Sequence, residues 1–120
     1  MAYREEREGA CVILTLDDAA AVADVATLSA HVARLLDSGV RALLWDLEGL
    51  DLLSSTFVGL LLHARRKLHA RGGHMVLVGV GRRAGATFKT FGVDDVLTRA
   101  PTREAAIERA LGLDPTEPAE

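Results

Sequence analysis

Two adjacent hydroxyl side chains, Ser55 and Thr56, stand where the chain passes from an apolar strand into a helix. Apolar residues recur after them at spacings of three and four, as one buried face of a helix requires. A hydroxyl residue at a helix start is ordinarily an N-cap, whose oxygen accepts a backbone N–H group. The same place tolerates an added phosphate, because unpaired N–H groups and the helix dipole favour negative charge there. The residues leave both roles open for Ser55.

Three carboxylates precede this hydroxyl pair. Asp46 ends the apolar run, where it could serve as a general base or a metal ligand. An aspartate in that place more often accepts hydrogen bonds from nearby backbone N–H groups and shapes the loop, and we favour this structural role. Glu48 and Asp51 lie in the loop, where they either give a partner-facing surface its acidity or are simply solvated.

The elements around these residues alternate between strand and helix patterns. Apolar runs of strand length flanked by helical stripes predict parallel β-α-β units with right-handed crossovers. In such sheets, sites collect where strands end and helices begin, which is where the hydroxyl pair lies. The predicted strands are Cys11–Leu16, Arg41–Asp46, Met75–Val80 and a short edge strand in Val93–Thr98, with a further pairing of the first through a turn near Gly9. The predicted helices lie within Val25–Leu36, Ser55–Ala70, Arg82–Thr90 (with Phe88 and Phe91 turned inward) and Thr102–Leu111.

The segment from the second strand into its helix resembles the signature of the STAS domain family, typified by bacterial anti-sigma factor antagonists. Asp46-Leu47-Glu48-Gly49-Leu50 is similar to the first half of the signature, and Gly59-Leu60-Leu61-Leu62 to the end of the second half. The likeness continues through 72–79 and 88–96 and so covers most of the chain. It implies a single α/β domain over residues 1–113, a small mixed β-sheet with about four helices packed mainly on one side. The segment 114–120 is acidic and contains two prolines, which predicts a flexible tail.

Anchored on Gly59, the resemblance places the family's phospho-accepting hydroxyl at Ser55 and the second hydroxyl at Thr56. The family's acidic residue falls on Ser54 and its first glycine on Phe57, so both positions depart from the signature. Phe57 shares the apolar stripe and is expected in the core; if it were exposed, it would be a docking anchor.

The resemblance implies a non-catalytic signalling module without a cofactor. In such antagonists the unphosphorylated form binds a kinase-type anti-sigma factor, and phosphate transfer to the serine separates the two proteins. We expect Ser55 to be the acceptor, with Thr56 as second choice, and the partner to be such a factor, a related serine kinase, or another STAS domain. The residues expected to contact the partner are Asp46, Glu48, Asp51, Ser54, Ser55, Thr56, Phe57 and Gly59.

Two other functions remain open. A STAS adaptor or scaffold subunit, of a lipid-transport ABC complex or a signalling assembly, would need no phosphorylation, and the loss of the acidic residue at Ser54 favours it. A nucleotide-binding protein built on Gly79-x-Gly81-x-x-x-Gly85 is disfavoured, because the glycine spacing departs from the dinucleotide fingerprint and no phosphate-loop lysine is present.

Composition excludes several other classes. The net charge of −3 and 4% aromatic residues argue against a nucleic-acid surface. His63, His69 and His74 do not have zinc-ligand spacing, so no metal site is predicted. The lone Cys11 precludes an intrachain disulfide, and no apolar run approaches the roughly 20 residues that span a bilayer. We therefore expect a cytoplasmic protein that does not insert into membranes.

Overall fold

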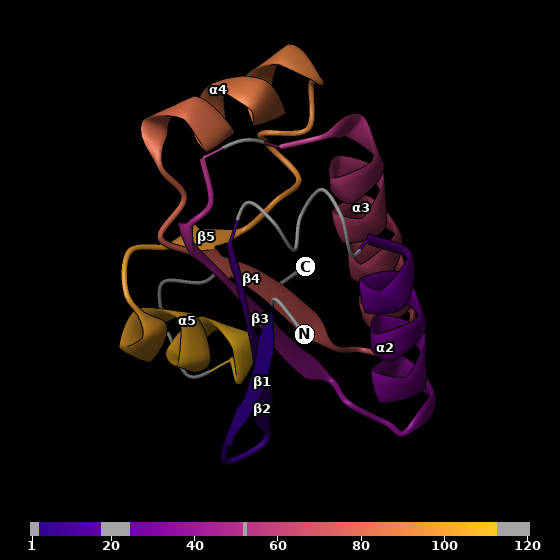
Figure 1. The fold of residues 1–120 in the computed structure, drawn as a ribbon. Coiled ribbons are helices and arrows are strands. Elements are labelled where there is room, and N and C mark those ends of the chain that lie inside the picture. The colour runs from indigo at the N-terminus through magenta and orange to yellow at the C-terminus, as the bar shows by residue number, and fades with distance from the viewer. Residues whose placement is uncertain (1–2, 18–24, 52, 113–120) are drawn as a thin grey trace.

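The computed structural model describes residues 3–17, 25–51 and 53–112, so the predicted tail at 114–120 lies outside the described residues. The described elements form one mixed sheet with helices around it (Figure 1). In chain order they are β1 (Arg4–Glu8), β2 (Cys11–Asp17), α2 (Val25–Asp37), β3 (Ala42–Gly49), α3 (Ser55–Ala70), β4 (His74–Val78), α4 (Arg82–Thr90), β5 (Arg99–Ala100) and α5 (Arg103–Ala110).

The sheet follows chain order, β1-β2-β3-β4-β5. β1 pairs antiparallel with β2 across a tight turn at Gly9, whose φ of 60° suits a residue without a Cβ atom. The other three pairings are parallel, so each requires a crossover, and helices provide it. The predicted β-α-β units and the hairpin near Gly9 are both confirmed.

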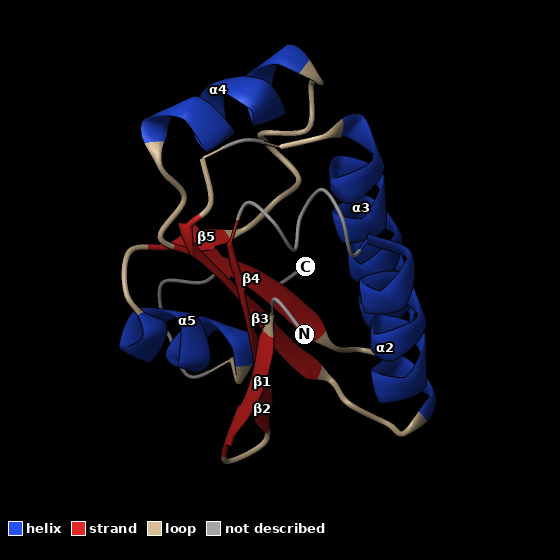
Figure 2. Ribbon diagram, in the orientation of Figure 1, coloured by secondary structure: helices blue, strands red, loops and turns tan. Residues whose placement is uncertain are grey.

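Helices cover both faces of the sheet (Figure 2). The long helices α2 and α3 pack on one face over the larger core, which includes Trp45, Phe57 and Phe88. The short helix α5 covers the opposite face over a smaller aliphatic core. The expectation of helices mainly on one side thus holds for the two long helices, and α5 adds a second layer. Because β3 is covered on both faces, every residue from position 42 to 47 is buried.

Two local predictions near the last strand are wrong. The short strand expected in Val93–Thr98 forms instead at Arg99–Ala100, because the backbone N–H groups of Val93 and Val96 close turns onto Phe88 and Val93. The sequence predicts that Phe91 faces inward, but α4 ends before it and Phe91 is 46% exposed, whereas Phe88 is fully buried. Among the described residues, no helix is long and apolar enough to cross a membrane.

Candidate functional site

The start of α3 is fixed by Ser54, not by Ser55. Ser54 has extended backbone angles and is the N-cap, and its Oγ accepts a hydrogen bond from the Phe57 N–H at 3.1 Å. Its carbonyl oxygen accepts the N–H of Val58 at 3.1 Å. The N-cap role that the sequence offered to Ser55 therefore belongs to its neighbour, and the serine that replaces the expected acidic residue has a structural task.

Ser55 and Thr56 occupy the first two positions of α3, and both are exposed. Within the described part of the chain, neither hydroxyl has a hydrogen-bond partner. Their N–H groups lie in the first turn, where a helix offers no carbonyl partner, and this turn holds no acidic residue. Ser55 is thus an accessible hydroxyl beside unpaired donors at the positive end of a helix.

Phe57 belongs to the core, as its place in the apolar stripe predicts, and the expected contact with a partner is wrong. Its side chain is fully buried, and its ring meets Trp45 edge to face with ring centroids 5.8 Å apart. Phe57 lies in the same apolar stripe as Leu61 and Ala64, which are also buried. The same periodicity that turns Ser55 and Thr56 outward turns Phe57 inward, so it cannot touch a partner in the folded domain.

Gly59 lies one turn after Ser55 on the outer surface of α3. It is exposed, and a Cβ atom at this position would meet no atom within 4 Å. Because residues four apart lie on one face of a helix, Gly59 and Ser55 share an outward face. Packing among the described residues therefore gives no reason for glycine here, although glycine inside a helix costs about 0.5–1 kcal/mol relative to alanine.

Asp46 is a buried structural carboxylate, as the sequence favoured. It is 6% exposed, and its Oδ1 accepts the N–H of Glu48 at 3.2 Å. Its Oδ2 pairs with Arg103 of α5, with Nε at 3.0 Å and a terminal nitrogen at 2.9 Å. The same guanidinium donates to Thr15 Oγ1 and to Glu6, at 3.0 Å and 3.2 Å.

The sequence analysis missed Arg103. This arginine joins β1, β2, β3 and α5 through one charge, and its hydrogen bond lowers the pKa of the Glu6 carboxyl. Asp46 and Arg103 are 57 positions apart, and no local sequence pattern predicts that they form an ion pair. Since Asp46 faces α5 while its neighbour Trp45 faces α3, Asp46 points away from the face that carries Ser55.

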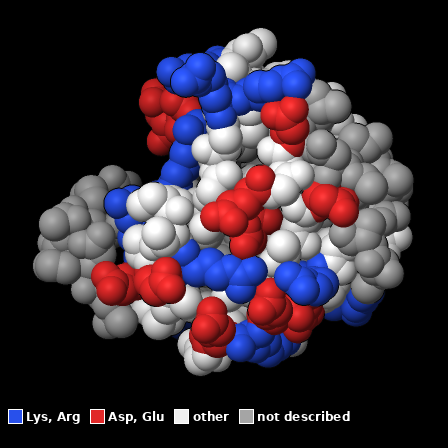
Figure 3. Space-filling view, turned by 60° about the vertical axis from the view of Figure 1, so that its left-hand side comes forward, with Lys and Arg blue, Asp and Glu red and all other residues white. Residues whose placement is uncertain are grey.

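The two carboxylates expected in the loop lie in different places, Glu48 near the end of strand β3 and Asp51 in the loop beyond it, beside α4. Asp51 accepts a hydrogen bond from Arg83 at 2.7 Å, and both side chains are more than half exposed. Glu48 lies against Gly79, where a Cβ atom would approach its Cγ to 2.1 Å. Figure 3 shows basic side chains gathered over α4, with acidic side chains directly below them. The end of the domain at the carboxyl ends of the strands therefore carries both signs of charge.

Two of the three glycines of the Gly79–Gly85 motif have packing explanations: Gly79, before α4, and Gly85, inside it. Gly79 has a φ of 70° and lies against Glu48, and a Cβ atom at Gly85 would approach Arg99 to 3.3 Å. Among the residues that the structure describes, no group of three or more His, Cys, Asp or Glu side chains could hold a metal ion.

Of the residues predicted for the site, Glu48 and Asp51 lie at the end of the sheet from which the chain enters α3, whereas Asp46 and Phe57 are buried away from that surface.

Comparisons with known proteins agree with this fold. The STAS domain family model matches residues 3–106. An anti-sigma F factor antagonist of Lysinibacillus sphaericus is 32% identical over 81 residues, 68% of each chain. The solved structure of the anti-sigma factor antagonist SpoIIAA in its unphosphorylated form superposes with a TM-score of 0.80 at 25% identity, over 94% of this chain and 99% of that one. The phosphorylated form of SpoIIAA, a Bacillus cell fate determinant, superposes with a TM-score of 0.66 at 26% identity, over 90% and 98%.

Proposed function

The chain belongs to the STAS domain family, and we propose that it is a non-catalytic anti-sigma factor antagonist whose binding to a kinase-type anti-sigma factor is switched by phosphorylation of Ser55. The observation that carries this proposal is the contrast between the two adjacent serines. Ser54 Oγ is committed to the N-cap, whereas Ser55 is exposed with no hydrogen bond to its hydroxyl among the described residues. Thr56 is exposed too, and it is the second choice.

The fold should tolerate a phosphate on Ser55. Phosphorylation adds about −1.5 to −2 charges and three strong acceptors. At the first position of α3 these meet the unpaired N–H groups and the positive end of the dipole, and the first turn contains no acidic residue to repel them. The Ser54 cap remains in place because its Oγ is not the modified atom.

A partner would not tolerate the same charge. At a protein–protein interface, an added charge that is desolvated or meets a like charge costs several kcal/mol. Each 1.4 kcal/mol is a tenfold change in affinity, so a cost of about 3–4 kcal/mol would separate the complex at ordinary concentrations. The phosphorylated domain would then remain folded but dissociate from its partner.

The proposed contact surface is the outward face at the start of α3. It contains Ser55, Thr56 and Gly59, all exposed, with Glu48 at the end of β3 and Asp51 in the loop that follows it. The open space over Gly59 suits close approach of a partner, because no described residue of the domain fills it. Asp46 and Phe57 would support this surface from inside without touching the partner.

One observation favours a second candidate, a STAS adaptor that binds its partner constitutively. Ser54 replaces the family's acidic residue, and its Oγ is tied to the Phe57 N–H, so it supplies no charge beside the acceptor. If a kinase requires that charge, Ser55 stays unmodified and the surface binds without a switch.

Intact mass measurement and phosphosite mapping on the protein recovered from its native cells separate the two functions. The proposed switch predicts a species with one phosphate on Ser55, absent from Ser55→Ala and retained in Thr56→Ala. A protein that is never phosphorylated, and that retains the same partner with Ser55 replaced by alanine or by aspartate, would be a constitutive adaptor and would refute the switch.

A further inference from the structure

A second surface lies at the opposite end of α3. The helix carries no acidic residue, and from its third turn onward it is basic. Where α3 ends, the side chains of Arg65 and His69 line a hollow of about 380 Å³, together with His74 of β4 and Arg109 of α5. Asp95 is the one acidic side chain among its described lining residues. The hollow therefore suits negatively charged groups.

The hollow surrounds an open strand edge. β5 pairs only with Leu77 and Val78, so the first three residues of β4 have no strand on that side within the described chain. The His74 N–H points toward β3 and donates to the carbonyl oxygen of Arg41, just before that strand, whereas the Leu77 N–H points the other way and donates to the carbonyl oxygen of Thr98. Backbone N–H and C=O groups point to alternate sides along a strand, so those of Met75 point to the same side as those of Leu77. At Met75 no strand of the described chain pairs with them, and they face the hollow.

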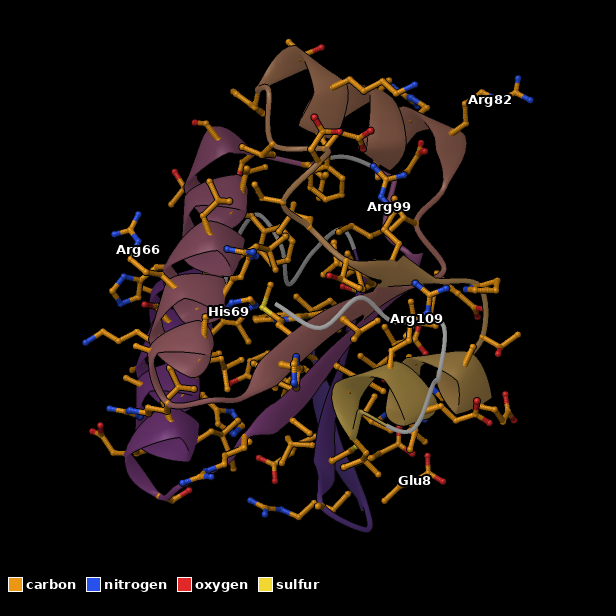
Figure 4. All side chains as sticks on the ribbon, turned by 180° about the vertical axis from the view of Figure 1, so that it is seen from behind. Glu8, Arg66, His69, Arg82, Arg99 and Arg109 are labelled. Carbon is orange, nitrogen blue, oxygen red and sulfur yellow. The ribbon has the colours of Figure 1, made fainter. Side chains whose placement is uncertain are left out.

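The basic side chains approach this edge from both faces of the sheet. Figure 4 shows His69 on α3 and Arg109 on α5, with β4 running between the two helices. Arg109 is held in place by donating to the carbonyl oxygen of Arg99 at 3.0 Å. The rings of His69 and His74 contact each other edge to face, with centroids 6.2 Å apart. A chain lying along Met75 would have basic groups above and below it.

We propose that this hollow binds an extended acidic peptide segment of a second protein. An added strand would pair its backbone with Met75, as peptides do at open sheet edges, and its carboxylates would meet Arg65 and Arg109 on either side. The charge complementarity commits the site to an acidic occupant. His69 lies fourteen positions after Ser55 in the same helix, a rise of about 21 Å, so the segment can bind while the Ser55 surface is occupied.

A synthetic peptide tests the chemistry. The probe is a hexapeptide of alternating aspartate and valine with blocked ends, and the control replaces each aspartate with asparagine. Titration into the full ¹⁵N-labelled chain is expected to shift the Met75 amide, with affinity falling at least tenfold between 20 and 300 mM salt. The asparagine peptide is expected to bind at least tenfold more weakly. Equal binding of the two peptides, or an unmoved Met75 amide, would overturn the proposal.

Matched charge reversals locate the site. Arg65 lines the hollow, and Arg65→Glu is expected to weaken binding of the acidic peptide at least tenfold. Arg82 lies on α4, at the far end of the molecule, and Arg82→Glu should change the affinity for the peptide less than twofold (Figure 4). Arg65 is on a helix surface outside the core, and dispersed amide spectra check that both variants fold. Equal loss in the two variants would show non-specific attraction and overturn the assignment.

The chain itself carries acidic residues at Asp114, Glu117 and Glu120. A full-length variant with all three replaced by their amides tests whether they are the occupant. The proposal predicts peptide affinity within twofold of the unmodified chain. An affinity gain of fivefold or more, with a displaced Met75 amide before any peptide is added, would assign the hollow to these residues and refute a second protein.

Discussion

Replacing Gly59 with alanine should stabilise the domain and weaken its proposed partner. Glycine inside an exposed helix costs about 0.5–1 kcal/mol relative to alanine, and the new methyl group would meet nothing within 4 Å. A gain of about 1 kcal/mol raises the melting temperature of a chain this size by roughly 3–6 °C. At the proposed interface, the same methyl group enters space meant for the partner, where overpacking costs about 1–3 kcal/mol, or roughly 5- to 150-fold in affinity.

Two assays read the two halves of this prediction. Thermal unfolding followed by circular dichroism measures stability, and the rate of phosphate transfer to Ser55 in extracts of the native cells measures partner recognition. Arg66 lies on an exposed part of α3 beyond the proposed surface, so Arg66→Ala is the matched control. It should leave both the melting temperature and the rate of phosphate transfer nearly unchanged. A destabilised Gly59→Ala protein would refute the packing argument. A stabilised protein with unchanged phosphate transfer would show that no partner approaches this face.

Three further predictions concern the groups that hold the site. Ser54→Ala should lower the free energy of unfolding by about 1 kcal/mol in urea titrations because the Phe57 N–H loses its cap, and Ser54→Asp should preserve it; equal stability of all three proteins would exclude the capping role. Arg103→Ala should lower the free energy of unfolding by about 2 kcal/mol, because it removes the arginine that pairs with the buried Asp46 carboxylate. A double variant that also carries Asp46→Asn should recover part of this loss, and purely additive effects of the two substitutions would show that the pair is not coupled. The hydrogen bond from His31 lowers the pKa of Glu5 below its ordinary 4.5. The stability that this bond adds is therefore complete above pH 4.5 and is lost as the pH falls through the lowered pKa. Glu5→Gln should reduce the loss of stability at acid pH, and an unchanged dependence of stability on pH would contradict the prediction.

The sequence predicts most of the scaffold because its elements are strongly periodic. Apolar runs of strand length and stripes of helical spacing are local signals, and the structure confirms the parallel units and the hairpin at Gly9. The prediction fails where the local signal is weak. Val93–Thr98 is apolar enough for a strand, yet turn hydrogen bonds use its backbone, and the two-residue strand lies just beyond it.

The sequence by itself also places an accessible hydroxyl at the start of α3, because the apolar stripe fixes which residues turn inward. It could not decide which of two adjacent serines caps the helix, since one residue's shift in the helix start exchanges their roles. Only the folded backbone, with Ser54 extended and its Oγ on the Phe57 N–H, assigns the cap and leaves Ser55 exposed.

Long-range contacts belong to the tertiary structure alone. Nothing near Asp46 in the sequence indicates that Arg103 will neutralise it, because the pair forms only when α5 returns to the sheet face opposite α3. The basic hollow has the same origin: Arg65 and Arg109 lie on different helices, and only the fold brings them to the part of the β4 edge that the short β5 leaves uncovered. Periodicity is a property of neighbours along the chain and can be read there, whereas charge pairing and open edges depend on which distant segments meet.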